Sequence, residues 1–344
     1  MWPAHLEDDR PGTVYVHGSK LAEFITAANG GGQAWRFRGQ WSSFMPRRGQ
    51  LYKSYRGLYA QTPDPQDFAA VMHSAQAAGC KPPASFADIF KQAVYQAPPA
   101  PRGALAFFRG RTFGGWEEAW TERAEGPIYW YDIRSAYRWA ACQGLPDPRT
   151  LVILTPRADD PLAVWMAELD AGTLPYAPAA GTHYITEAER AAFGIGRDKL
   201  RHGLGARRAV DLRPVFARVD RAFPHCAKRI SRAFWGVWNS SAPSERVSWR
   251  TGERVSTLRN KSYNPTWALW ITARVKLRLA EIPGKLHAFV DSVLTRAPLP
   301  TGDDVGAWRM VEPEPLPSVW IRWPGYFGSG PRVIKHAGEK VAAP

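Results

Sequence analysis

The chain has 344 residues, of which 45 are Lys or Arg and 31 are Asp or Glu, so its formal net charge is +14. This length suggests two or three domains, and a hydrophobic content of 45% excludes an intrinsically disordered protein. The basic excess indicates a polyanionic partner, nucleic acid ahead of an anionic membrane, and no apolar run reaches the ~18 residues that a membrane span needs.

The N-terminal end carries Glu7, Asp8 and Asp9, which do not suit a signal or transit peptide. We therefore expect a cytoplasmic protein with no membrane partner. The three cysteines are widely spaced and form neither a disulfide framework nor a zinc-binding pattern. The stretch QAPPAPRG at 96–103 is the best linker candidate, because proline and glycine interrupt regular structure.

After this linker, the chain reads YWYDIRSAYRWA at 129–140. Residues 128–131 are aromatic or β-branched and predict a strand, whereas 134–143 predict a helix. Asp132 lies between the two. A carboxylate at a strand end beside a helix N-terminus is well placed to hold a hard cation such as Mg²⁺. An isolated Asp in this position is also a common turn or cap residue.

Positive charge is concentrated in residues 201–261, which hold 14 Lys and Arg against 4 Asp and Glu. Within this segment, KRISRAFWGVWN places Lys228, Arg232 and Trp235 on one helical face, because they are four and three residues apart. The opposite face is apolar and can pack. The charged face suits a triphosphate with a stacked base, and a plain surface helix with extended basic side chains is the alternative.

The segment KLHAFVDSVLTR at 285–296 places Asp291 and Ser292 between two short apolar runs, directly after Pro283 and Gly284. This pattern predicts a β-hairpin with a carboxylate in or near its turn. A plain Asp-Ser turn without chemistry explains the same pattern, so the functional interpretation depends on the two earlier segments.

In this order, the three segments resemble the signature of family B DNA polymerases, most closely the bacteriophage and plasmid group that includes protein-primed enzymes. The first palm motif of that family is Asp-x-x-Ser-Leu-Tyr-Pro, and Asp132, Ser135 and Tyr137 match its spacing. The second is Tyr-x-Asp-Thr-Asp-Ser, and Asp291 and Ser292 match its end.

The fingers motif, Lys-x-x-x-Asn-x-x-Tyr-Gly, is matched in spacing by Lys228, Trp235 and Gly236. Weaker landmarks in the same order are FRGRT at 108–112, the helix-like segment 264–281, GAWRM at 306–310 and KHAG at 335–338. The chain departs from the family at Phe289, which replaces the first Asp of the second palm motif, and at Arg232, which replaces the fingers Asn.

The resemblance implies a DNA-templated DNA polymerase that uses two-metal-ion nucleotidyl transfer. Asp132, Asp291 and the backbone carbonyl of Ile133 would hold two Mg²⁺ ions, with Mn²⁺ as a substitute. Lys228 would neutralise the triphosphate, and Tyr137 would reject a ribose 2′-hydroxyl. The other implied substrate contacts are Ser135, Arg232, Trp235 and Gly236. The implied DNA contacts are Phe108, Arg109, Gly110, Arg111, Ser292 and Lys335.

The N-terminal part resembles a shortened exonuclease domain. Residues 13–25 are similar to the second exonuclease motif, but Gly18 and Ala22 stand where Asn and Asp belong. Residues 51–56 weakly resemble a later strand of the exonuclease domain, with Lys53 in place of Asp. We therefore expect no proofreading. The short C-terminal part leaves room for a small thumb only, from which we expect low processivity.

We thus predict an α/β fold with a right-hand polymerase palm, fingers and a minimal thumb, preceded by a degenerate exonuclease-like α/β domain. The predicted limits are 1–99 for the exonuclease-like domain, 100–204 and 262–310 for the palm, 205–261 for the fingers and 311–344 for the thumb. The expected partners in the bacterial host cell are primer-template DNA and dNTPs, with a terminal protein, a clamp or another replication factor as further candidates. Two alternatives remain open: a weak or inactive nucleic-acid-binding protein on a polymerase scaffold, and a primase-like or terminal-transferase-like nucleotidyltransferase.

Overall fold

The computed structural model describes residues 101–108, 113–177, 179–224, 227–239, 244–247, 254–257, 263–323 and 326–335, and before these only 36–37, 40–41, 74, 77–78 and 90. The fold is mixed α/β, as predicted. The chain divides into two compact units, one of Met1–Pro99 with Arg213–Tyr263 and one of Ala100–Leu212 with Asn264–Pro344. Among the described residues, no helix is long and apolar enough to cross a membrane.

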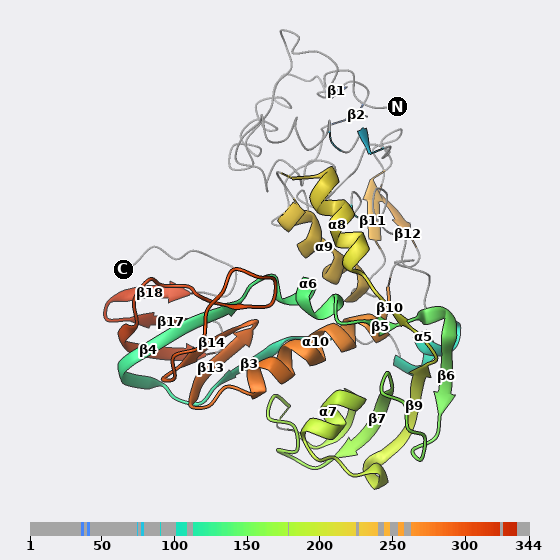
Figure 1. The fold of residues 1–344 in the computed structure, drawn as a ribbon, viewed down its shortest axis with the longest axis horizontal. Helices are drawn as coiled ribbons and strands as arrows, with labels where there is room; N and C mark the ends of the chain where they lie inside the picture. Colours follow the sequence, from blue (N-terminus) through green and yellow to red (C-terminus); the bar gives the residue numbers. More distant parts are fainter. Residues whose placement is uncertain are drawn as a thin grey trace. The chain divides into compact units, whose positions relative to one another are not determined.

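The second unit is built on an antiparallel sheet of eight strands, here called the larger sheet (Figure 1). Its order is β18-β17-β16-β4-β14-β13-β3, and β15 also pairs with β4. The strands are β3 (Trp116–Ala119), β4 (Arg123–Ile133), β13 (Lys285–Val290), β14 (Ser292–Thr295), β15 (Trp308–Met310), β16 (Leu316–Trp323), β17 (Tyr326–Ser329) and β18 (Arg332–Lys335). The 11-residue strand β4 is central, because β16 pairs with its first half and β14 and β15 flank its second half.

Two local predictions are confirmed in this sheet. The predicted strand at 128–131 lies within β4, and the predicted hairpin is β13 and β14 with Asp291 in the turn between them. Phe289 pairs with Ser292, so the turn consists of Val290 and Asp291. Val290 has a φ of 61°, which is a strained conformation for a β-branched residue. The turn that carries the carboxylate is therefore held in place by the strands on both sides.

Helix α10 (Pro265–Ala280) lies between the larger sheet and a second sheet (Figure 1). It contacts α6 (Ala136–Ala141) and β13 on one side, and β8 (Gly181–Thr186) and α7 (Glu187–Ala192) on the other. The Asn264 side chain caps the helix by accepting from the backbone N–H of Trp267, and Pro265 occupies the first turn. The helix is apolar around most of its circumference because it is covered on several sides.

The second sheet, here called the smaller sheet, has the antiparallel order β6-β9-β7-β8. Its other strands are β6 (Leu151–Leu154), β7 (Val164–Leu169) and β9 (Leu200–Ala206). Its core includes Trp165, Ile185 and Leu200. Helix α7 begins with a capping box between Thr186 and Glu189. The short elements around this sheet are α5 (Arg102–Phe108), β5 (Leu145–Pro146), η5 (Pro148–Thr150), η6 (Arg197–Lys199) and β10 (Ala209–Val210).

The first unit contains α8 (Arg213–Ala222) and α9 (Ala227–Asn239), the hairpin of β11 (Ser244–Val247) and β12 (Arg254–Thr257), and the short strands β1 (Arg36–Phe37) and β2 (Gln40–Trp41). Aromatic rings of Phe90, Phe216, Phe234 and Trp238 pack together between 4.8 and 6.2 Å apart. The predicted helix at 228–239 is confirmed as α9. Its two faces are also as predicted, since Phe234 is buried and Lys228 is exposed.

We expect Arg274→Met to lower the free energy of unfolding by about 2–3 kcal/mol. Arg274 on α10 donates to three backbone carbonyls at the C-terminal end of α6, those of Ala140 (2.7 Å), Gln143 (3.1 Å) and Gly144 (2.6 Å). Burial lowers the pKa of Arg274 to about 10, so the guanidinium stays charged at neutral pH. The methionine fills space but leaves these carbonyls without the charged donor.

Urea denaturation followed by tryptophan fluorescence measures this loss. Arg296→Met is the matched control, because the exposed Arg296 makes one hydrogen bond of 2.8 Å to the carbonyl of Glu125 and its loss should change stability by less than about 0.5 kcal/mol. Equal midpoints for the two variants would mean that the Arg274 contacts do not hold α6.

Candidate active site

The two predicted metal-binding aspartates lie at the end of one strand and in the hairpin turn beside it. Asp132 is the penultimate residue of β4 and pairs with Ser292, the first residue of β14. Asp291 immediately precedes Ser292, and its carbonyl accepts a hydrogen bond of 3.0 Å from the backbone N–H of Ile133. Sheet geometry therefore puts the Cα atoms of the two aspartates within about 8 Å of each other. Ile133 itself has a buried side chain and is tied to the turn through this backbone bond.

Tyr137 lies in the first turn of α6, near Asp291. The chain turns from β4 into α6 through Ser135, an exposed residue in the left-handed conformation with φ 50°. Burial raises the pKa of the Tyr137 phenol well above its usual value, and the carboxylates of Asp291 and Glu117 raise it further. The phenol is therefore neutral at any physiological pH. Both carboxylates must lie near it to exert this influence.

One row of side chains crosses the larger sheet at this level. Arg309 pairs with Asp132, Asp132 with Ser292, Ser292 with Phe289, and Phe289 with Glu117. Directly paired residues of an antiparallel sheet project to the same face, so these five share one face. The row places a carboxylate on β4 and another on β3, with Phe289 between them. Phe289, which replaces an Asp of the second palm motif, is half-buried. Its ring stacks with the ring of His287.

Arg309 forms an ion pair with Asp132 that the sequence analysis did not anticipate. Its Nη2 donates to Asp132 Oδ2 at 2.6 Å. The segment GAWRM at 306–310 was noted as a landmark of the family, but nothing in it identifies the acid that Arg309 meets. The two residues are 177 positions apart in the chain. Only the pairing of β15 with β4 brings them together.

The loop before β15 is fastened to the turn after β4. The guanidinium of Arg134 donates to the carbonyl of Gly302 (2.7 Å) and to Asp303 (2.8 Å). Two backbone bonds, from Arg134 to the Ala307 carbonyl and from Gly306 to the Arg134 carbonyl, measure 2.9 and 2.8 Å. These four bonds fix the register of β15 beside Asp132.

Two predicted DNA contacts require correction. The Phe108 side chain is fully buried and packs against Phe107, Phe113 and Tyr184, so it has no surface to offer to a nucleic acid. The Ser292 side chain is buried as well, and its hydroxyl donates to the carbonyl of Phe289 at 3.0 Å. Phe108 packs in an aromatic cluster beside β8, and Ser292 packs in the hairpin next to Asp132. Sequence spacing carried no information on this burial.

The remaining predicted site residues belong to other elements. Lys228, Arg232, Trp235 and Gly236 belong to α9 in the first unit, where Lys228 and Gly236 are exposed and Trp235 is half-buried. Lys335 ends β18 and pairs with Phe327. Arg109, Gly110 and Arg111 lie outside the described residues.

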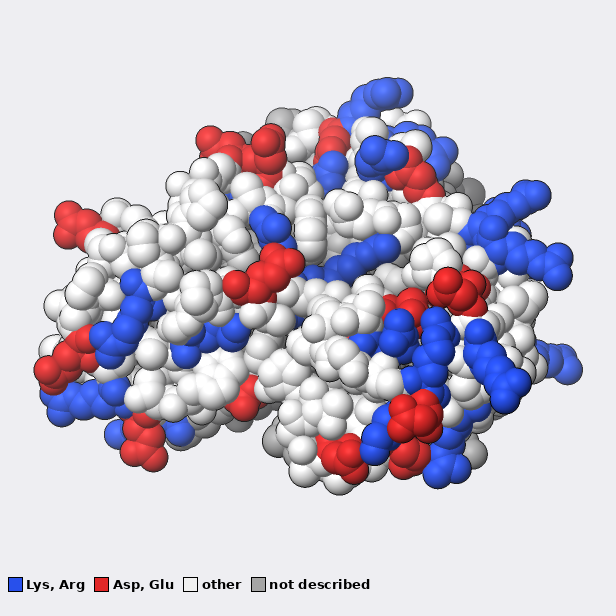
Figure 2. All heavy atoms as spheres, turned by 60° about the horizontal axis from the view of Figure 1, so that its bottom comes forward, with Lys and Arg blue, Asp and Glu red and all other residues white. Residues whose placement is uncertain are grey.

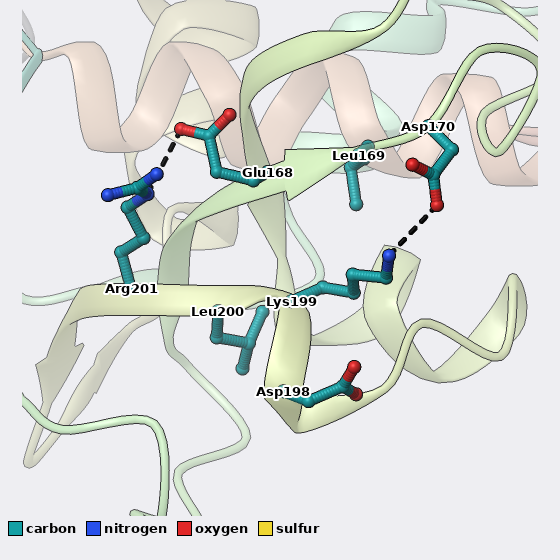
Figure 3. A pocket seen from close by; sticks show the side chains of 7 residues that line it. All are labelled: Glu168, Leu169, Asp170, Asp198, Lys199, Leu200 and Arg201. Carbon is teal, nitrogen blue, oxygen red and sulfur yellow. Dashed lines mark hydrogen bonds and ion pairs between the residues drawn. The ribbon is translucent and has the colours of Figure 1, made fainter.

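The smaller sheet carries a hollow of about 400 Å³ between β7 and β9. Figure 3 shows its charged side chains paired with each other, Lys199 with Asp170 at 2.9 Å and Arg201 with Glu168 at 3.1 Å. Leu169 and Leu200 complete the wall, together with Asp198. Both cations of the hollow are neutralised within it, so it does not suit an anionic ligand such as a nucleotide.

The charges around this hollow are mixed as well. Figure 2 shows a face of the molecule on which Lys and Arg side chains are interspersed with Asp and Glu. The pairs of the hollow and the pair of Arg197 with Asp159, at 3.3 Å, are of this kind. We therefore place no nucleic-acid track on the smaller sheet.

Among solved structures, the chain is similar to Phi29 DNA polymerase. For its complex with primer-template DNA the TM-score is 0.56 at 12% identity, over 91% of this chain and 65% of the polymerase. For its complex with single-stranded DNA the values are 0.55, 13%, 93% and 67%.

The TM-scores of 0.56 and 0.55 establish a shared fold, and an identity of 12–13% establishes nothing finer. The chain spans about two thirds of the length of the polymerase that it matches. No protein-family model and no curated protein matches the sequence.

The site contains the kind of ligand atoms that divalent cations prefer. Asp132 and Asp291 supply carboxylate oxygens, which Mg²⁺ and Mn²⁺ prefer, and the pairing of β4 with β14 holds the two residues close in the backbone. The described residues contain no cluster of three or more acidic, histidine or cysteine side chains. A cation here would therefore depend on two carboxylates, with backbone oxygens, water and substrate completing its shell.

Proposed function

We propose that this chain is a DNA-templated DNA polymerase whose active site is centred on Asp132 and Asp291. The backbone adjacency of these two residues supports the proposal, since Asp132 ends β4 and Asp291 lies in the turn before the paired strand β14, in a fold similar to that of Phi29 DNA polymerase. Family B, a compact form of the phage and plasmid group, is the assignment that the sequence resemblance supports.

The proposed reaction is addition of one nucleotide to a primer. The primer 3′-hydroxyl gives its proton to a water molecule, and its oxygen attacks the α-phosphorus of a dNTP. The bond from that phosphorus to the β-phosphate oxygen breaks, and pyrophosphate leaves. Two Mg²⁺ ions held by Asp132, Asp291 and the Ile133 carbonyl, with Mn²⁺ as a substitute, would supply charge stabilisation to the attacking and leaving oxygens.

The other residues bind and orient the substrates. Lys228, with Arg232 beside it, would neutralise the triphosphate, and Trp235 and Gly236 would border the nascent base pair. Ser135 is proposed as a further substrate contact. Arg109, Gly110, Arg111 and Lys335 are the proposed contacts to DNA. In this proposal the fingers are residues 205–261, which include α8 and α9, and the palm is 100–204 with 262–310. Residues 311–344, which include β16, β17 and β18, are a reduced thumb.

Three further features belong to this proposal. The N-terminal part acts as an inactive exonuclease-like domain, so the enzyme does not proofread. Its processivity is low without a partner, for which a terminal protein, a clamp or another replication factor are the candidates. The proposed setting is a bacterial host cell.

Tyr137→Ala should lower the preference for dNTPs over rNTPs by about tenfold or more. The ring comes from the first turn of α6 toward Asp291, where it would exclude a 2′-hydroxyl by its bulk. Tyr137→Phe keeps the ring and should retain the preference, because exclusion depends on volume and not on the phenol oxygen. Single-nucleotide incorporation with paired dNTP and rNTP measures this ratio. Equal ratios in wild type and Tyr137→Ala would remove Tyr137 from this role.

Extension of a labelled DNA primer on a template, with dNTPs and Mg²⁺ or Mn²⁺, tests the proposed function. Products that follow the template sequence support it. Synthesis without a primer would indicate a primase-like enzyme, and untemplated addition would indicate a terminal transferase. No synthesis with either cation, together with salt-sensitive DNA binding, would indicate a binding protein on a polymerase scaffold.

A further inference from the structure

Arg309 lies where a cation would approach Asp132. Its Nη2 is 2.6 Å from Asp132 Oδ2, and the exposed fractions of the two side chains are 37% and 20%. Within the described part of the chain, no other cation pairs with Asp132, and no other acid pairs with Arg309. The pair is thus half-buried, short and exclusive among these residues.

The position of Arg309 is built into the fold. It occupies the middle of β15, whose three residues pair in register with β4. On the preceding side, the loop is fastened by Arg134 and by the Gly306 backbone bond. The Nε of Arg309 is buried and makes no hydrogen bond with the described residues, and the contact to Asp132 is made by Nη2.

We propose that Arg309 is an internal counter-ion that competes with a divalent cation for Asp132, so that cation binding requires the guanidinium to leave this carboxylate. The inference rests on the proposed function for the nature of the cation. Oδ2 cannot keep a charge-assisted hydrogen bond of this length and also bind a metal in the same direction. A retained guanidinium would in addition repel a divalent ion a few ångströms away.

The consequence is a weakened cation site in the protein without substrate. Arg309 stabilises the ionised Asp132 when no cation is bound and raises the cation concentration needed to displace it. Removing the guanidinium should tighten cation binding by about tenfold, which combines the lost ion pair with the lost repulsion.

The test is Mn²⁺ binding to the full chain without DNA or nucleotide, measured from the electron paramagnetic resonance signal of free Mn²⁺. Arg309→Met should bind Mn²⁺ about tenfold more tightly than wild type, and Arg309→Lys, which keeps the charge, should change the affinity less. Arg332→Met is the matched control. It removes the same charge from β18, where Arg332 pairs with Glu312 at 3.3 Å, and should leave the affinity within about twofold of wild type.

The gain must depend on the carboxylate. In an Asp132→Asn background, Arg309→Met should not tighten Mn²⁺ binding, because the carboxylate for which Arg309 and the cation compete is gone. If thermal melting shows that Arg309→Met does not fold, Arg309→Gln is used in its place. The glutamine variant is expected to bind Mn²⁺ as the methionine variant would.

The outcomes separate the inference from the function on which it rests. Mn²⁺ binding that Asp132→Asn abolishes but Arg309→Met leaves unchanged overturns the inference and leaves the metal site in place. No saturable binding to either protein overturns both. Tighter binding to Arg309→Met in a protein that extends no primer supports the inference and removes the polymerase function.

Discussion

Asp132→Asn and Asp291→Asn should each lower the rate of nucleotide addition by about 10³-fold or more, with DNA binding retained. Asparagine keeps the size of the side chain but removes the negative charge that holds a cation. Asp132 ends β4 and Asp291 lies in the adjacent hairpin turn, and both are proposed to hold the same pair of ions, so the loss of either should disable the site. The double variant should therefore be no slower than the slower single one.

Single-turnover incorporation of one dNTP into a primer-template measures this effect. Asp170→Asn is the matched control, since Asp170 is an exposed carboxylate of the smaller sheet paired with Lys199, and its loss should change the rate by less than about twofold. Asp132→Asn also breaks the pair with Arg309, so a stability difference between the two active-site variants is expected. Substantial incorporation by Asp291→Asn would show that the hairpin carboxylate does not hold a cation.

Gly306→Ala should lower the free energy of unfolding by about 3–4 kcal/mol. Gly306 has a φ of 92°, a conformation that side chains with a Cβ rarely adopt. An added Cβ would also lie 2.0 Å from Cδ1 of Trp139, on α6. Either the loop or the tryptophan must move. Because this loop leads into β15, the displacement should also disturb the contact between Arg309 and Asp132.

Gly172→Ala measures the loss of stability that a positive φ causes without a side-chain clash. Gly172 has a φ of 77° and no atom within 4 Å of an added Cβ, so it should cost only about 1 kcal/mol. Chemical denaturation of both variants gives the difference due to the clash. If Gly306→Ala costs no more than Gly172→Ala, then Trp139 yields without penalty and does not fix the loop.

Local patterns in the sequence were sufficient for the elements of the site. The aromatic and β-branched run before Asp132 predicted β4, and the apolar runs around Asp291 predicted the hairpin. Helical spacing predicted α9 and the sides on which Lys228 and Phe234 lie. These predictions succeed because strand and helix periodicity are properties of neighbouring residues.

The residues that meet across the sheet could not be obtained in this way. The approach of Asp132 to Asp291 was expected only through the order of motifs in a known family, and their strands become neighbours by pairing between distant segments. The smaller sheet was not predicted as a separate sheet, because its strands are short and joined by loops. Phe108 and Ser292 matched expected positions, but their burial depends on what packs over them.

Arg309 shows the limit most clearly. Nothing within GAWRM distinguishes an arginine that faces solvent from one that forms an ion pair with a carboxylate. Its partner is 177 residues away and is selected by the register of β15 on β4. Residue type and spacing therefore specified which strands, helices and carboxylates this chain contains. The register between distant strands decided which charges face each other, because a shift of one residue sends every side chain of a strand to the opposite face.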